Sequence, residues 1–212
     1  PIEPGDVCWE DINGDNKING LDREVVGNIF PKVTGGFSST LSWKGISLYA
    51  RFDYALGHTL YNDLAARTLG QYQGAFNIIT EVKDMWSEDN PNSDLPAFYY
   101  ADQLAKKNIT RSNNASASRH NNSSRLYEKA DYLALRELTL SWDLPKAWTS
   151  KAFIQNASVY VTGQNLFYVT GYTGTSPEPV LTNSDNNENL YGVDQGRYPT
   201  PRTVLFGLSV TF

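Results

Sequence analysis

The last eleven residues, 202–212 (RTVLFGLSVTF), place the tightest constraint on the fold. Apolar side chains stand at every second position, namely Val204, Phe206, Leu208, Val210 and Phe212. A period of two puts them on one face of a β-strand and the intervening residues on the other. The length matches the roughly 9–11 residues of a tilted strand that crosses a bilayer. Because an unpaired apolar edge invites aggregation in a soluble sheet, we expect this strand to close a β-barrel.

Composition agrees with an all-β chain. The 212 residues include 13 Tyr, 9 Phe and 5 Trp together with 16 Gly and 10 Pro, which favours strands separated by many turns. The absence of an 18-residue apolar run excludes a membrane-spanning helix, whereas alternating barrel strands remain compatible with the mean hydropathy of −0.45. The net charge of −5 with no basic block predicts no nucleic-acid partner. Because the chain begins at Pro1, we interpret it as a fragment.

Residues 1–32 contain the spacing of a calcium-binding loop. Side-chain oxygens stand at loop positions 1, 3, 5, 9 and 12, supplied by Asp11, Asn13, Asp15, Asn19 and Asp22. Lys17 at position 7 offers its backbone carbonyl, so the set matches the EF-hand pattern of hard oxygen ligands. Position 6 is Asn16 rather than Gly, which Asn tolerates in the left-handed region, and Asp22 replaces the usual Glu, as in dockerin loops. The sequence predicts a calcium ion here; the alternative is a polar surface turn that binds nothing.

The period-two pattern predicts five strands, at residues 33–43, 46–57, 131–143, 154–169 and 202–212. Trp43 and Tyr54 near strand ends suit the aromatic girdle of a membrane barrel. In the third strand, Leu133 and Leu135 have the opposite parity to Leu138 and Leu140, which indicates a bulge or a loop extension. Five strands cannot close a membrane barrel, so we expect the others upstream of Pro1 or in another polypeptide.

The connections alternate in length, which predicts a topology. Short turns at 44–45 and 144–153 alternate with long loops at 58–130 and 170–201. Outer-membrane barrels have short periplasmic turns and long extracellular loops, so both long loops and the calcium loop are expected outside. Within the longer loop we expect one short helix around 75–86, from the spacing of Phe76, Ile79 and Trp86.

Several stretches resemble the SusC/RagA-type TonB-dependent transporters of the bacterial outer membrane. They are PGDV-x-WEDINGDNKINGLDREVVGN, LSWKGISLYARFDYALG, DYLALRELTLSWDLP, ASVYVTGQNLFYVTGYTGTSPE and RYPTPRTVLFGLSVTF. The resemblance implies the C-terminal part of a transmembrane antiparallel barrel of about 22 strands around a plug. It also implies import of oligosaccharides or oligopeptides, a SusD-like surface lipoprotein as partner, contact with outer-membrane lipid, and energy from the TonB complex through the absent N-terminal part. The terminal Phe212 resembles the insertion signal of such barrels.

Two other classes of function stay open at this stage. A secreted, calcium-dependent carbohydrate-binding β-sandwich explains the aromatic residues and the ion, but explains poorly a 70-residue loop. An enzyme has little support because the only histidines, His58 and His120, lie in no nucleophile or metal motif, although a carboxylate pair has no required spacing. Substrate residues are left unassigned; loop aromatics that could stack on sugars are Tyr72, Trp86, Tyr99, Tyr100 and Tyr191.

Overall fold

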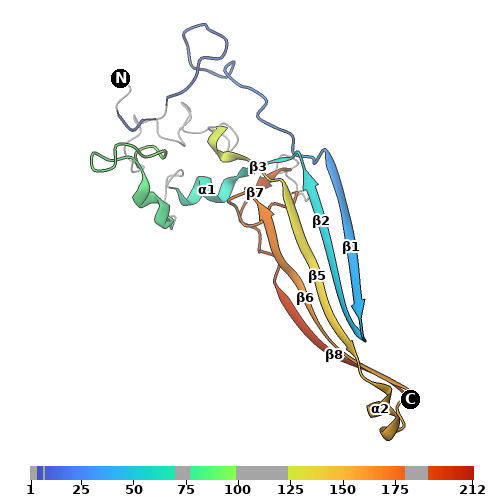
Figure 1. Cartoon of the computed structure of the whole chain (residues 1–212). Coiled ribbons are helices and arrows are strands. Elements are labelled where there is room, and N and C mark those ends of the chain that lie inside the picture. The colour runs from blue at the N-terminus through green and yellow to red at the C-terminus, as the bar shows by residue number, and fades with distance from the viewer. Residues whose placement is uncertain (1–3, 7, 70–76, 99–123, 180–190) are drawn as a thin grey trace. The chain divides into compact units, whose positions relative to one another are not determined.

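The computed structural model of the chain describes residues 4–6, 8–69, 77–98, 124–179 and 191–212, in two compact units. The first unit comprises Pro1–Ile29, Thr59–Glu128 and Val180–Arg197, and the second comprises Phe30–His58, Lys129–Pro179 and Tyr198–Phe212. The second unit contains the larger of two sheets (Figure 1).

The larger sheet has five antiparallel strands in the order β1-β2-β5-β6-β8. Their bounds are Val33–Trp43, Ile46–Leu56, Tyr132–Asp143, Asn156–Thr170 and Thr203–Thr211. Each coincides with a strand expected from the alternating pattern, and no bound differs by more than two residues. The predicted all-β class is therefore confirmed, and the strands follow the stretches in which the two-residue period is strongest.

The two ends of this sheet differ in how the chain leaves them. Lys44 and Gly45 join β1 to β2 with φ angles of 48° and 85°, the positive values of a tight hairpin turn. Residues 144–155 join β5 to β6 at the same end, where β8 also finishes (Figure 1). The long segments 57–131 and 171–202 leave from the opposite end, which is the arrangement that the alternation of connection lengths predicts.

The two long segments are not entirely loops, and here the structure differs from the sequence expectation. Strands β3 (Thr59–Asn62), β4 (Tyr127–Lys129) and β7 (Val193–Asp194) form a second sheet in the order β4-β3-β7. Strands β3 and β7 are parallel and pair Tyr61 with Val193. Strands of two to four residues have no readable period, so only pairing between distant segments reveals them.

The helices are short. Helix α1 (Asp63–Thr68) begins after Asn62, whose side chain accepts the N–H of Ala65, a standard N-cap. The other α-helix is α2 (Lys146–Thr149), and the 3-10 helices are η1 (Thr80–Asp84), η2 (Ser124–Leu126) and η3 (Ser150–Ala152). The described part of the helix expected at 75–86 is only η1; Phe76 lies outside the described residues. None of the described helices is long and apolar enough to cross a membrane.

A bulge in β5 explains the change of parity in its sequence. Arg51 pairs with Glu137 and Phe52 with Leu135, so Arg136 has no partner in β2. The register with β6 shifts at the same place, between Leu135 and Glu137. The extra residue restores the phase, because Leu133 and Leu135 then lie on the same face as Leu138 and Leu140. Of the two possibilities that the sequence left open, the bulge is the one present.

Gly36 in β1 gives a test of how closely the strands approach. A Cβ atom at this position would lie 2.9 Å from the backbone oxygen of Phe52 on β2, whereas one at Gly171 would meet nothing within 4 Å. We expect Gly36→Ala to lower the free energy of unfolding by about 1–3 kcal/mol, because a strand must shift. Gly171→Ala is the control and should change it by less than about 0.5 kcal/mol. Equal unfolding midpoints in the two variants would contradict this close approach.

Candidate functional site

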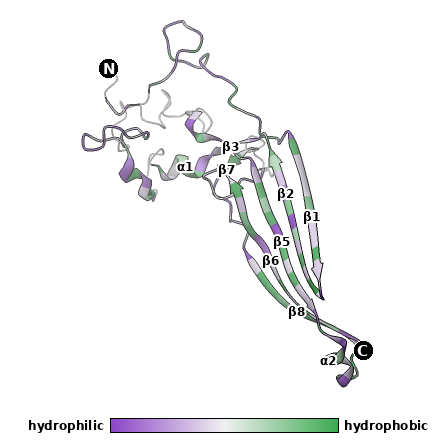
Figure 2. Cartoon of the chain, in the orientation of Figure 1, coloured by the Kyte–Doolittle hydropathy of each residue, from purple (hydrophilic) through white to green (hydrophobic). Residues whose placement is uncertain are grey.

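One face of the five-stranded sheet is apolar across every strand. Two successive cross-strand rows consist of Leu41, Leu48, Leu140, Val161 and Phe206, and of Trp43, Ile46, Trp142, Val159 and Leu208. Several of these large side chains are strongly exposed, with 82% for Phe206 and 70% for Trp43. Along the strands, apolar and polar residues alternate (Figure 2). Large apolar side chains exposed in contiguous rows across five strands are unusual on the surface of a monomer in water.

The opposite face is mainly polar in the intervening rows, with Leu205 and Gly207 of β8 as the exceptions. These rows are Ser38, Arg51, Glu137, Gln164 and Thr203; Thr40, Tyr49, Thr139, Thr162 and Leu205; and Ser42, Ser47, Ser141, Tyr160 and Gly207. Hydroxyl pairs bridge strands on this face, with 2.8 Å between the oxygens of Ser42 and Ser47 and 2.8 Å between those of Thr139 and Thr162. The sheet therefore has one apolar face and one mainly polar face.

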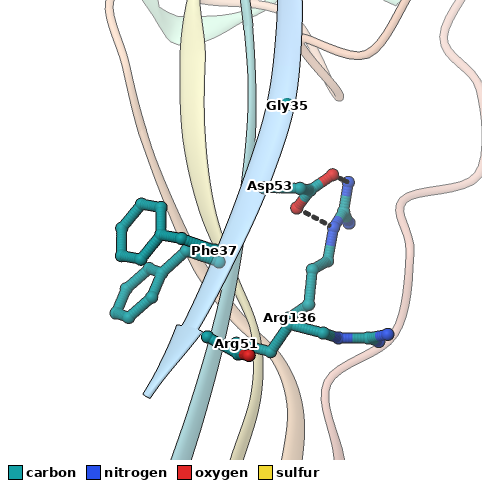
Figure 3. A pocket seen from close by; sticks show the side chains of 8 residues that line it. Gly35, Phe37, Arg51, Asp53 and Arg136 are labelled. Carbon is teal, nitrogen blue, oxygen red and sulfur yellow. Dashed lines mark hydrogen bonds and ion pairs between the residues drawn. The ribbon is translucent and has the colours of Figure 1, made fainter.

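The bulge directs Arg136 onto this polar face, where it is the centre of a charged cluster. Its Nε lies 2.5 Å from Asp53 Oδ1 and its Nη2 lies 3.0 Å from Asp53 Oδ2, a bidentate pair (Figure 3). The guanidinium also donates to Glu178 and, over 2.8 Å, to the Tyr168 hydroxyl. Tyr168 in turn donates to Glu178 over 2.9 Å. Two carboxylates and a phenol thus satisfy one guanidinium, which is only 16% exposed.

A shallow cavity of about 510 Å³ lies beside this cluster, and its lining includes Gly36, Ser38, Arg51, Asp53 and Arg136 (Figure 3). Arg51 differs from Arg136 because its side chain is 55% exposed and its ion pair with Glu137 is long, at 3.9 Å. Phe37 and Phe52 also line the cavity, which therefore combines aromatic surface with one loosely paired guanidinium. Its lining holds no hydroxyl–imidazole or carboxylate-pair arrangement that performs acid–base or nucleophilic chemistry.

The segment after β6 folds back onto the same cluster. Glu178 of this segment binds Arg136, and the carbonyl of the preceding Pro177 lies 2.8 Å from Nε2 of His58. The His58 side chain is 1% exposed and packs edge-on against Tyr132. Thr170 Oγ1 donates to the carbonyl of Asp131 over 2.8 Å. His58 is thus placed to hold a backbone segment, whereas His120 lies outside the described residues.

The predicted calcium loop is closed by its own side chains. Asp11 accepts the backbone N–H groups of Gly14, Asp15 and Asn16 over 2.8, 3.2 and 2.6 Å. Asp22 accepts those of Ile12 and Asn19 over 3.1 and 2.7 Å. The first and last predicted ligands therefore both bind the backbone of the turn between them, which brings the two ends of the loop together.

The remaining predicted ligands also take part in the loop. Asn13 accepts the N–H of Asp15, Asp15 accepts that of Lys17, and Asn19 accepts that of Leu21, over 2.8–2.9 Å. Asn16 has a φ of 60°, the left-handed conformation expected for position 6. Hydrogen bonds from the backbone N–H groups of Asn19, and then of Asn13 and Ile12, lower the pKa of Asp22 below its ordinary value. No group of three or more His, Cys, Asp and Glu side chains in the described residues is arranged to hold a metal ion.

The aromatic residues considered for sugar stacking are only partly described. Trp86 is half-buried, and a Cβ atom at Gly5 would lie 2.4 Å from its ring, so the two are in close contact. Tyr191 is 40% exposed, and Tyr72, Tyr99 and Tyr100 lie outside the described residues. Sequence reasoning missed the cluster of Arg136, Glu178 and Tyr168. The parity change in β5 was the one available signal, because it marks the residue that leaves the ladder.

No protein-family model matches the chain. Three relatives from Formosa agariphila match it over almost its whole length. TonB-dependent receptor P3 is 30% identical over 99% of this chain, TonB-dependent receptor P26 is 30% identical over 100%, and TonB-dependent receptor P39 is 27% identical over 100%. The chain spans only 19–20% of the length of these relatives.

Solved structures agree with the relatives. The chain matches a structure of the RagAB peptide transporter with a TM-score of 0.63 at 28% identity, covering 87% of this chain and 17% of that one. It also matches the RagAB peptide importer in the open-open state with a TM-score of 0.65 at 26% identity, covering 98% and 20%. In sequence and in fold, this chain therefore resembles a segment of the TonB-dependent receptors over its whole length, and the resemblance expected from its motifs is confirmed.

Proposed function

We propose that the chain is a segment of an outer-membrane, TonB-dependent importer and supplies five strands of its barrel wall. The observation that carries this proposal is the pair of apolar rows that runs without interruption across β1, β2, β5, β6 and β8. In a membrane barrel these rows face lipid and the intervening polar rows face the lumen. Edge strands β1 and β8 then pair with strands from the rest of the parent protein, so that no edge is exposed.

The orientation in the membrane follows from the two ends of the sheet. Short turns belong on the periplasmic side and long segments on the extracellular side of such barrels. We therefore place Lys44–Gly45 and residues 144–155 in the periplasm, and segments 57–131 and 171–202 at the cell surface.

We infer the partners and the substrate class of the whole protein from the family resemblance. Beyond this chain we infer the remaining barrel strands, a plug, a site for the TonB complex and a SusD-like surface lipoprotein. The polar face of the sheet is compatible with an oligopeptide or a glycan as substrate, and the structures named as a RagAB peptide importer favour the peptide. The named relatives are receptors, and the lining of the cavity beside Arg136 has no catalytic arrangement, so we propose no enzymatic activity.

The second candidate function is that of a secreted carbohydrate-binding β-sandwich. The exposure of the apolar rows disfavours it. A sandwich buries the apolar face of each sheet against another sheet. In the described part of the chain, Phe206, Leu208 and Trp43 instead remain 82%, 65% and 70% exposed. Lipid is the covering that fits these side chains.

We propose that the loop from Asp11 to Asp22 binds a calcium ion that braces an extracellular segment. The ligands would be the side chains of Asp11, Asn13, Asp15, Asn19 and Asp22 with the carbonyl of Lys17. The closed backbone, the left-handed Asn16 and the lowered pKa of Asp22 support the proposal, because calcium requires oxygen ligands around one tight turn. The ion would offset the repulsion among three carboxylates in an exposed loop.

The orientation can be tested with single cysteines in a background in which the exposed Cys8 is replaced by Ser. Asn92 is exposed and lies in the long segment before β5. The variant Asn92→Cys should therefore react with a membrane-impermeant maleimide on intact cells. Lys44→Cys should react only after the outer membrane is permeabilised. Labelling of Lys44→Cys but not Asn92→Cys on intact cells would overturn the orientation, and complete recovery of the protein in buffer without detergent would overturn the membrane assignment.

Calcium binding can be tested with Asp11→Ala combined with Asp15→Ala in the intact receptor. The wild-type protein should lose thermal stability when a calcium chelator is added, and the double variant should not respond because two ligands are gone. A matched control is Glu88→Ala with Asp89→Ala, two exposed acids whose removal changes the net charge equally. A chelator response that is the same in wild-type, double variant and control would exclude the loop as the site.

The Arg136 cluster can be tested with Arg136→Met, which leaves Asp53 and Glu178 without their shared cation. We expect the free energy of unfolding to fall by about 1–3 kcal/mol, less than for a fully buried pair because both carboxylates are about one-third exposed. Amide hydrogen exchange should also become faster in residues 171–179 and stay unchanged in β8. Arg51→Met is the control, because its 3.9 Å pair is exposed and should contribute less than about 0.5 kcal/mol. Equal effects of the two variants would contradict an anchoring role.

A further inference from the structure

The end of the five-stranded sheet that carries the short connections has a distinct chemistry. Beyond the last apolar row lie the β1–β2 turn and the segment 144–155, which contains α2 and η3. The charged side chains of residues 43–46 and 142–156 are three lysines and one aspartate, namely Lys44, Lys146, Lys151 and Asp143, all exposed. The side chains of these two segments therefore carry a net charge of +2, three minus one, in a chain whose side chains together carry −5.

Large exposed aromatic rings lie among these lysines. Trp148 of α2 is 60% exposed and packs edge-on against Trp142, with 5.8 Å between ring centroids. Phe153 is 93% exposed, and its φ of 58° is an uncommon conformation for a bulky residue. Lys44 Nζ lies 4.7 Å from the ring centroid of Trp43. Lys44 is therefore next to a ring that would sit at the boundary between hydrocarbon and water.

Backbone hydrogen bonds hold this end as one surface. The N–H of Asp143 donates to the carbonyl of Gly45, that of Leu144 to Ala157, and that of Gln155 to Thr211, each over 2.8 Å. Both short connections are thereby attached to the strand ends. The three lysines therefore lie on connections that are bonded to the strand ends.

We propose that this turn-end rim, made of Lys44, Lys146, Lys151, Trp43, Trp148 and Phe153, binds the head groups of anionic phospholipids in the leaflet next to the short turns. The proposal rests on the membrane assignment made above and specifies the lipid. Aromatic rings prefer the interfacial region, and lysines there extend their ammonium groups to the phosphates. Because the three lysines of the rim outnumber the one neighbouring acid, Asp143, a lipid with a net negative head group is held more tightly than a zwitterionic one.

The test is a lipid titration of the intact receptor that contains this chain, purified in detergent and monitored by native mass spectrometry. Phosphatidylglycerol is the anionic probe and phosphatidylethanolamine the zwitterionic one. The variant K44Q/K146Q/K151Q should weaken phosphatidylglycerol binding by about tenfold at low salt, and leave phosphatidylethanolamine binding unchanged. Replacing the same three lysines by arginine keeps the charge and should retain the preference for phosphatidylglycerol.

The matched control is K32Q/K83Q/K129Q, which removes three exposed lysines outside segments 43–46 and 142–156 and should leave the preference intact. Equal losses in the test and control variants would overturn the proposal, because the effect would then depend on overall charge. Equal affinity of the wild-type protein for the two lipids would also overturn it, while leaving the membrane assignment standing. A protein that stays monomeric and folded without detergent would instead refute the membrane assignment itself.

Discussion

The register of the five strands is the constraint on which the larger sheet depends. Because side chains alternate faces with a period of two, a slip of one residue in any strand would move its apolar set to the polar face. The rows that contain Trp43 and Leu41 stay in phase across all five strands. This phase gives the sheet one face suited to lipid and one suited to water, and the proposed function follows from that separation.

Arg136 links this register to the segment that follows β6. As the extra residue of the bulge, it corrects the phase of β5, and the same displacement aims its side chain at Asp53 and Glu178. A partly buried guanidinium is costly without partners, so the bulge requires the two carboxylates. The bulge that corrects the register of β5 therefore also attaches residues 171–179 to the sheet. One residue thus connects the geometry of the strands with the position of a long connecting segment.

The two ends of the sheet have different chemistry, which suits the two sides of an asymmetric membrane. One end has tight turns with lysines and aromatic rings, attached to the strands by backbone hydrogen bonds. The other end continues into the long segments, which include the paired strands β3 and β7. The loop from Asp11 to Asp22 uses Asx-type hydrogen bonds from Asn13, Asp15 and Asn19 to keep side-chain oxygens within one turn. In the proposed transporter, the first end would meet the periplasmic leaflet and the loop would lie on the extracellular side.

The sequence of the chain alone predicted the five long strands, with bounds correct to within two residues. It also predicted the alternation of short and long connections. The reason is that strands such as β1 and β8 have one apolar face and one mainly polar face, so apolar and polar residues alternate along their sequence. The ligand pattern from Asp11 to Asp22 and the family resemblance are also local in sequence. Only the tertiary structure decided that Arg136 is the bulged residue, that it meets Asp53 and Glu178, and that β3 pairs with β7. These contacts join residues 42 to about 130 positions apart, and no local pattern encodes a partner that lies so far along the chain.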